Sequence, residues 1–192
     1  MKLDRRIKLW FRKTLMDRGI DLYKRSPDRK LLEKKILPHL AALPDCRRVL
    51  FIGCDWYTRG YRRFFAQQDY WTLDYDPAKQ PFGSSQHIVD SMTNLAAHFA
   101  ADSLDVIVCN GVFGYGLDAP DAVTEAFNAC YDSLRSGGIL VIGWNDVPGR
   151  RPFDPLTSPG LQRFKPHVPA VIGSARVVVP MRTRHTYDFL IK

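Results

Sequence analysis

The sequence predicts an α/β fold, with a doubly wound, mostly parallel sheet, an antiparallel C-terminal strand pair and N-terminal helices. Short, mainly apolar runs, typical of strands buried on both faces, alternate with helical segments from residue 49 onwards. The run 49–52 is followed at once by Gly53, and the next run ends in Asp74, 21 positions after that glycine. A strand, a tight glycine turn and a later strand-end acid are typical of a nucleotide-binding unit.

The N-terminal part predicts two helices. Apolar residues stand near helical spacing at positions 3, 7, 10, 11, 15 and 20, and Lys and Arg fill much of the remaining surface. Ser26 is an N-cap candidate, and Pro27 suits the first position of a second helix from about residue 28 to 37. We expect Pro38 and Pro44 to loosen the chain before the first strand.

The remaining elements follow in order. Residues 60–68 predict a helix start, 76–83 a loop, 95–101 a short helical segment and 121–134 a helix that ends before Gly137. Pro-rich residues 146–170 predict no long helix. The expected strands are 49–52, 70–75, 87–89, 104–109, 139–144, 176–179 and 186–191.

Four polar or flexible residues stand at the carboxyl ends of expected strands: Gly53, Asp74, Asp90 and Asn110. In a doubly wound sheet the ligand binds beyond these ends, so we expect a site there. Each residue also has a structural interpretation. The two acids suit caps of following turns, and the amide suits a turn.

Composition indicates a soluble globular protein, with 45% hydrophobic and 25% charged residues. No apolar run approaches the roughly 18 residues of a membrane-spanning helix. The four cysteines lack metal-ligand or redox spacing, and we expect small buried thiols in a reduced, cytoplasmic protein. The five histidines show no metal-ligand spacing, so no metal is expected.

The net charge of +8 belongs to the N-terminal segment. Residues 1–48 hold fifteen Lys or Arg against six Asp or Glu, whereas residues 49–192 hold thirteen against fourteen. We expect 1–46 to form a basic helical extension packed on the core of a domain over 47–192. A second interpretation is that residues 1–35 meet an anionic membrane surface, peripherally, or an acidic partner. Nucleic acid is disfavoured, because no recognised nucleic-acid-binding pattern is present.

Five segments between residues 48 and 144 resemble the class I S-adenosylmethionine-dependent methyltransferases, a Rossmann-like family. VLFIGCD resembles the family's first motif, LDYDP the second, HIVDSM the third and LDVIVCNGVFGY the fourth. AFNACYDSLRSGGILVIGW, over 126–144, resembles the family's helix, L-x-x-G-G and strand segment, and this match is the most specific.

The resemblance implies S-adenosylmethionine as the cofactor and a role for each motif residue. Gly53 would let the chain pass close to the carboxypropyl part, and Asp74 would bind the ribose hydroxyls. Asp90 would face the adenine amino group, Met92 would pack on the ring, and Asn110 would lie below the methionine moiety. The implied cofactor-binding set is Gly53, Cys54, Asp55, Asp74, Tyr75, Asp90, Ser91, Met92 and Asn110.

The first motif departs from the family pattern. Phe51 stands where an acid is usual, and Asp55 and Tyr57 stand where two further glycines are usual. These two side chains would either narrow the cofactor pocket, or Asp55 would replace the missing acid and meet the cofactor's amino group.

Two functions remain open. The first is a methyltransferase acting on a small-molecule, glycan or lipid-linked acceptor; the second is a non-catalytic member that binds a ligand or partner. A nicotinamide-dependent oxidoreductase is disfavoured by the glycine pattern and the antiparallel tail. A hydroxyl acceptor would want a general base, for which Asp146 ranks ahead of His167 and His185, and none is assigned.

Overall fold

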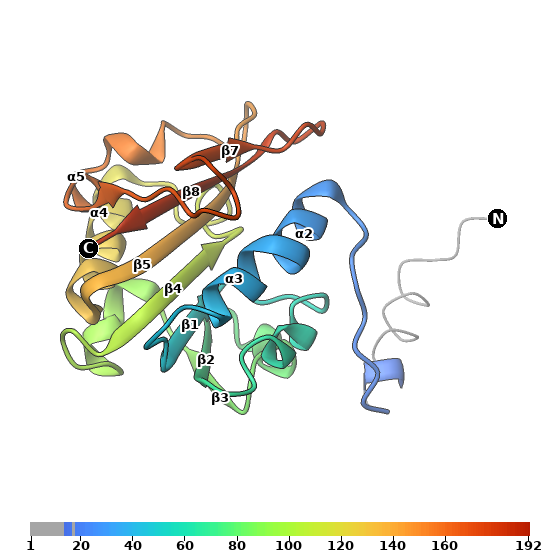
Figure 1. The fold of residues 1–192 in the computed structure, drawn as a ribbon. Helices are drawn as coiled ribbons and strands as arrows, with labels where there is room; N and C mark the ends of the chain where they lie inside the picture. The colour runs from blue at the N-terminus through green and yellow to red at the C-terminus, as the bar shows by residue number, and fades with distance from the viewer. Residues whose placement is uncertain (1–13, 17) are drawn as a thin grey trace.

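The protein is built on one 8-stranded sheet in the order β3-β2-β1-β4-β5-β8-β6, with β7 also paired to β8 (Figure 1). This computed structural model describes residues 14–16 and 18–192. The strands are β1 Arg48–Ile52, β2 Asp69–Asp74, β3 Gln86–Val89, β4 Leu104–Asn110, β5 Leu134–Asn145, β6 Lys165–Pro166, β7 Arg176–Val178 and β8 His185–Ile191.

The strand directions confirm the predicted fold class. Strands β3, β2, β1, β4 and β5 run parallel, whereas β8 runs antiparallel to β5 and to both β6 and β7. The chain moves outward from β1 to β2 and β3, then returns to place β4 on the other side of β1. This reversal opens a crevice between the carboxyl ends of β1 and β4, where Ile52 pairs with Cys109.

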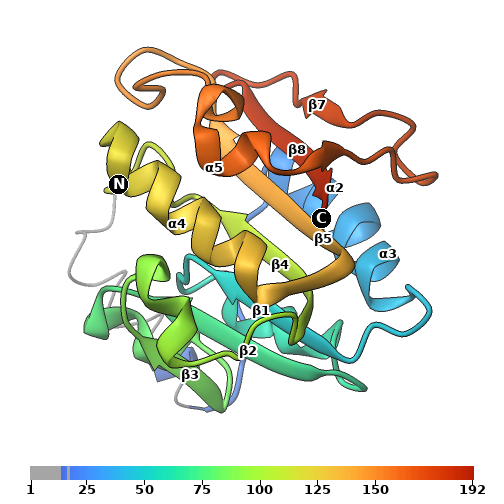
Figure 2. The same cartoon turned by 90° about the vertical axis from the view of Figure 1, so that its left-hand side faces the viewer.

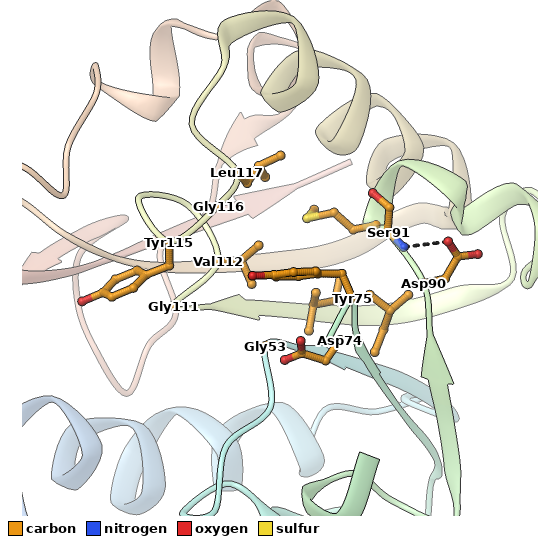
Figure 3. Close-up of a pocket in the computed structure, with 13 residues that line it drawn as sticks. Gly53, Asp74, Tyr75, Asp90, Ser91, Gly111, Val112, Tyr115, Gly116 and Leu117 are labelled. Atoms are coloured by element: carbon orange, nitrogen blue, oxygen red, sulfur yellow. Dashed lines mark hydrogen bonds between the residues drawn. The ribbon is translucent and has the colours of Figure 1, made fainter. Parts of the chain in front are cut away.

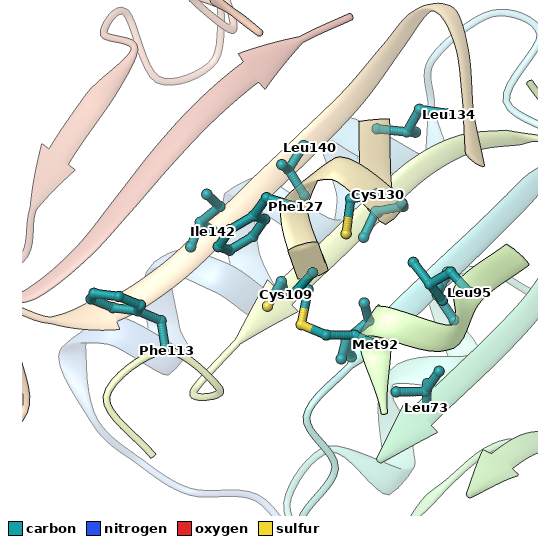
Figure 4. Close-up of a cluster of buried hydrophobic side chains, with 14 of the residues drawn as sticks. Leu73, Met92, Leu95, Cys109, Phe113, Phe127, Cys130, Leu134, Leu140 and Ile142 are labelled. Carbon is teal, nitrogen blue, oxygen red and sulfur yellow. The ribbon is translucent and has the colours of Figure 1, made fainter. Parts of the chain in front are cut away.

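Helices cover both faces of the sheet, as Figures 1 and 2 show together. On one face lie α4, Pro120–Ser133, the short α5, Pro159–Gln162, and the 3-10 helix η4, Met92–Ala97. Figure 4 shows the core beneath them, where Phe127 and Cys130 of α4 meet Leu140 and Ile142 of β5. These side chains are almost fully buried, because the mainly apolar strands lie between two layers of helices.

The opposite face is covered by one helical stretch: α2 Pro27–Leu31, the π-helical turn η1 Leu32–Ile36 and α3 Leu37–Ala41. The expected break at Pro38 is therefore wrong, since the helix passes through it. Proline lacks an N–H and crowds the preceding turn, and a π-helical turn just before it accommodates both effects. Leu32 and Ile36 pack on Val49 and Phe51 of β1.

Three short elements differ from their expected form. Residues 59–63 form a 3-10 helix, η2 Arg59–Arg63, followed by turns instead of an α-helix to 68. Gly60 weakens an α-helix, and Tyr61 is held in the core by edge contact with Phe51, 5.4 Å between ring centroids. Residues 77–82 form η3, Pro77–Phe82, where a loop was expected, because Asp76 caps Ala78 N–H. Helix η4 begins at Met92 rather than 95, because Ser91 caps Thr93 N–H.

The expected first N-terminal helix lies largely outside the described residues. Residues 14–16 are helical, whereas residues 18–26, including the apolar Ile20, are not. None of the helices within the described ranges is long and apolar enough to cross a bilayer.

Candidate functional site

Two adjoining cavities lie at the carboxyl ends of the parallel strands. The apolar cavity, about 370 Å³, is walled mainly by Ile52, Leu73, Met92, Val112 and Leu117 (Figure 3). The polar cavity, about 400 Å³, is walled by charged and amide side chains that include Asp28, Arg29, Asn110, Asn145 and His185. Five residues border both cavities: Gly53, Asp74, Tyr75, Gly111 and Tyr115. These five residues form the junction of the two cavities.

Gly53 brings bare backbone to the junction. Its φ of +95° favours glycine, and its N–H donates to the Leu73 carbonyl across the β1–β2 boundary. A Cβ at this position would lie 2.5 Å from the Asn110 carbonyl oxygen and 2.9 Å from Val112 Cγ2. The turn after β1 therefore requires glycine and brings its backbone to the border of both cavities.

Asp74 closes the end of β2 and faces both cavities. Its Oδ2 accepts from Cys54 N–H at 2.7 Å, and its Oδ1 accepts from Asp76 N–H at 3.0 Å. The carboxylate thus ties the loops after β1 and β2 together, as the structural interpretation expected. Each oxygen keeps a further lone pair, so the same group can also accept from ligand hydroxyls.

Asp90, Ser91 and Met92 all line the apolar cavity. The Asp90 carboxylate is turned away from the cavity (Figure 3) and accepts from His98, Asn94 and Ser91 N–H. The hydrogen bond from His98, with those from Asn94 and Ser91, holds the pKa of Asp90 below its ordinary value. Met92 is buried and belongs to both the cavity wall and the core.

Asp55 and Tyr57 line the polar cavity and not the apolar one. Asp55 accepts from Trp56 N–H at 2.7 Å and pairs with Lys79 at 3.6 Å. The side chains that replace the family's glycines therefore stand around the polar cavity and leave the apolar cavity open.

Two cysteines of the strand ends are inert. Burial raises the pKa of Cys54 to about 12, with the Asp74 charge adding to the shift, and burial also raises the pKa of Cys109 to about 12. Cys54 contributes its backbone N–H to the Asp74 carboxylate, so its place in the site is through the main chain.

Asn110 ends β4 at the crevice and lines the polar cavity. Its side-chain amide is buried, and neither amide atom has a hydrogen-bond partner within the described part of the chain. A Cβ at Gly143, on the neighbouring β5, would lie 2.3 Å from Asn110 Oδ1, so glycine at 143 makes room for this amide.

A buried ion pair on α2 is the main element that the sequence did not reveal. Asp28 and Arg29 are 4% and 5% exposed, with 3.3 Å between Asp28 Oδ2 and Arg29 Nε. The guanidinium lies 4.6 Å above the Tyr57 ring. Asp28 Oδ1, Arg29 Nε and Arg29 Nη1 are buried with no hydrogen-bond partner among the described residues. The signal was present, because both residues precede Leu32 by three or four positions and so share its buried helix face.

The structure places one of the three general-base candidates, His185, in a cavity wall. Asp146 forms ion pairs with Arg151 and Arg184 and lines neither cavity. His167, which follows β6, also lines neither cavity. His185 lines the polar cavity, with its Nδ1 2.7 Å from Asn145 Oδ1. In the described ranges, no cluster of three or more His, Cys, Asp or Glu could hold a metal.

Comparison with known proteins gives matches in structure only. No protein-family model matches the sequence, and no curated protein matches it either.

Solved structures are similar over nearly the whole chain. The N-methyltransferase NodS of Bradyrhizobium japonicum, in complex with S-adenosylhomocysteine, aligns with a TM-score of 0.67 at 15% identity, over 88% of this chain and 89% of that one. A TehB-like S-adenosylmethionine-dependent methyltransferase of Corynebacterium glutamicum aligns with a TM-score of 0.55 at 20% identity, over 97% and 95%. A 1,6-didemethyltoxoflavin N1-methyltransferase of Burkholderia thailandensis gives 0.54 at 16%, over 100% and 91%. The chain has the Rossmann-like fold of the class I S-adenosylmethionine-dependent methyltransferases.

Proposed function

We propose that the protein binds S-adenosylmethionine and transfers its methyl group to a small acceptor. The observation that supports this most is the pairing of an apolar cavity with a charged one at the carboxyl ends of the strands. A nucleoside with a zwitterionic amino-acid tail has the same division of polarity. The adenine would lie in the apolar cavity against Met92, and the ribose hydroxyls would bond to Asp74.

The Asp28–Arg29 pair suits the amino-acid tail. Arg29 Nη1, which has no hydrogen-bond partner among the described residues, matches a carboxylate, and Asp28 Oδ1, which also has none, matches an ammonium. Phe51, where the family has an acid, is fully buried in the core under α2. In this proposal α2 supplies the charges that the first motif lacks, and Asp55 stays paired with Lys79.

The bound cofactor would supply an electrophilic methyl group on a sulfonium. The residues of this chain would hold the two reactants in line, which is the main source of acceleration for such a transfer. Among the similar structures, NodS and the toxoflavin enzyme were solved with S-adenosylhomocysteine, and the latter also with its small-molecule acceptor. Cavities of about 370 and 400 Å³ fit a cofactor and a small molecule or the end of a glycan or lipid-linked acceptor.

Calorimetric titration with S-adenosylmethionine and S-adenosylhomocysteine tests the proposal. We expect micromolar binding that Asp74→Ala removes. Asp69→Ala is the matched control, because Asp69 lies at the amino end of the same strand, away from the cavities, and pairs with Arg48. A folded sample that binds neither compound would contradict the proposal and favour a non-catalytic member of the fold.

The role of the basic N-terminal segment stays a prediction, as do the division at residues 46 and 47 and the cytoplasmic location. Co-sedimentation with anionic vesicles, with and without residues 1–25, addresses membrane contact. Equal recovery of the two forms would count against it.

A further inference from the structure

Tyr115 stands at the junction of the two cavities, between the places proposed for the adenine and for the amino-acid tail, so the sulfonium methyl group would lie near it. Its side chain is 39% exposed, so a second ligand can reach it. It follows the glycine turn after β4, and in Figure 3 its ring extends away from Tyr75, with the hydroxyl at the far end. Asn145, which lines the polar cavity, holds this hydroxyl, so an acceptor that enters from the polar cavity meets it.

Hydrogen bonds from β5 and β8 fix the direction of that hydroxyl. Asn145 Nδ2 donates to the Tyr115 oxygen, while Asn145 Oδ1 faces His185 Nδ1 at 2.7 Å and so requires a hydrogen on that nitrogen. The chain of donors runs from His185 through Asn145 to Tyr115. The Tyr115 O–H is left to donate towards the ligand.

A cation strengthens this donor. The Arg150 guanidinium lies 4.1 Å from the centroid of the Tyr115 ring, and its Nη1 is anchored on the Gly114 carbonyl. Positive charge above a phenol ring favours donation from its hydroxyl and attracts an anionic partner. A carboxylate oxygen is the strongest common acceptor for such a donor.

The four carboxylates that line the polar cavity are each already engaged. Asp28 pairs with Arg29, Asp55 with Lys79, Asp74 accepts two backbone N–H groups, and Asp76 accepts Ala78 N–H. His185 Nε2 is shielded from solvent, and burial, with Arg29 and Lys24 adding to it against the opposing effect of Asp28, lowers the pKa of His185 to about 4.

A carboxylate or imidazole base of low pKa disfavours acceptors that must lose a proton before methylation. A base with a pKa near 4 is about six units too weak to deprotonate a phenol or alkylammonium group with a pKa of about 10. A carboxylic acid, with a pKa of about 4, is already ionised at neutral pH and needs no base.

We propose that the methyl acceptor is a small carboxylate, held at the junction by the Tyr115 hydroxyl and oriented through Asn145 and His185. This inference rests on the proposed function. The carboxylate oxygen forms a bond to the methyl carbon, and the electron pair of the broken carbon–sulfur bond returns to sulfur. The products are a methyl ester and a neutral thioether, and no proton moves. Tyr115 is the residue that touches the acceptor, whereas Asn145 and His185 are positioning residues.

Benzoate and its neutral isostere benzamide are the probes, titrated calorimetrically into protein saturated with S-adenosylhomocysteine. We expect benzoate to bind more tightly than benzamide. Tyr115→Phe keeps the ring under Arg150 but removes the donor, so it should weaken benzoate binding about 10-fold or more and leave benzamide unchanged. Equal affinity for the two probes, or a Tyr115→Phe variant that binds benzoate like the wild type, would overturn the inference.

Tyr131→Phe is the matched control, because Arg163 lies 3.9 Å from the centroid of that ring and Tyr131 lines neither cavity. It should bind benzoate as the wild type does. Titration of S-adenosylhomocysteine alone distinguishes failure of the carboxylate inference from failure of the proposed function. If this compound binds and benzoate shows no preference, only the carboxylate inference fails. If it does not bind, the proposed function fails.

Discussion

Arg29→Met tests whether α2 holds the amino-acid tail of the cofactor. S-adenosylhomocysteine carries that tail, and 5′-methylthioadenosine lacks it. Hydrogen bonds to charged groups contribute about 1.5–3 kcal/mol each, which corresponds to about 10- to 150-fold in Kd. We expect Arg29→Met to weaken S-adenosylhomocysteine by this factor, measured by calorimetry, and to leave 5′-methylthioadenosine unchanged.

The stability of the variant has to be followed in the same samples. Arg29→Met leaves the Asp28 carboxylate buried without its partner, at a cost of about 3–5 kcal/mol in the free energy of unfolding. Asp28→Asn combined with Arg29→Met removes both charges and should recover much of that loss, measured by urea denaturation. The affinity loss should persist in the double variant.

Arg25→Met is the control, since Arg25 is exposed and lines neither the apolar nor the polar cavity. It should leave both affinities unchanged. An Arg29→Met variant that weakens both ligands equally would refute the reasoning, because the effect would then reach the nucleoside half through a general change in structure.

Three further predictions concern the scaffold of the site. Gly53→Ala should cost roughly 1–2 kcal/mol of stability through its φ of +95° alone, with more from the clash at the Asn110 carbonyl; a wild-type urea midpoint would contradict this. Phe127→Ala, in a fully buried position, should lower the free energy of unfolding by about 3–5 kcal/mol, and a loss under 1 kcal/mol would mean that α4 does not pack as described. Burial alone would raise the pKa of Asp105, but the hydrogen bond from Arg135 and two backbone N–H groups outweigh it and hold the pKa below its ordinary value. The ionised Asp105 therefore stabilises the fold above about pH 4, and this stabilisation is lost as pH falls through the lower folded-state pKa. Asp105→Asn should therefore reduce the fall of the urea midpoint at acid pH. An unchanged fall would argue against this.

The sheet could be predicted from the sequence because each central strand is a mainly apolar run. The runs 49–52 and 104–109 match β1 and β4 within one residue at each end. The short helices could not, because single capping contacts decide them. Ser91 starts η4 by accepting from Thr93 N–H, and no periodicity shows such a contact in advance.

The site divides in the same way. Gly53, Asp74 and Asn110 could be placed together from the sequence, because parallel strands end at one edge of a sheet. Arg29 and His185 could not, since their positions depend on which face α2 covers and on the insertion of β8 beside β5. For this reason the sequence could not show that His185, and not Asp146, lines the polar cavity.

Different parts of the chain position the Tyr115 hydroxyl and shape the polar cavity around it. Asn145 and His185 are direct partners in the register of β5 and β8, so the ladder that joins the strands also holds the amide that aims Tyr115. Met181 and Thr183, which also line the polar cavity, come instead from the connection between β7 and β8, over 179–184. Insertions or deletions in that connection can reshape the space for an acceptor without moving the amide–imidazole pair, which makes it the natural place to re-engineer substrate choice.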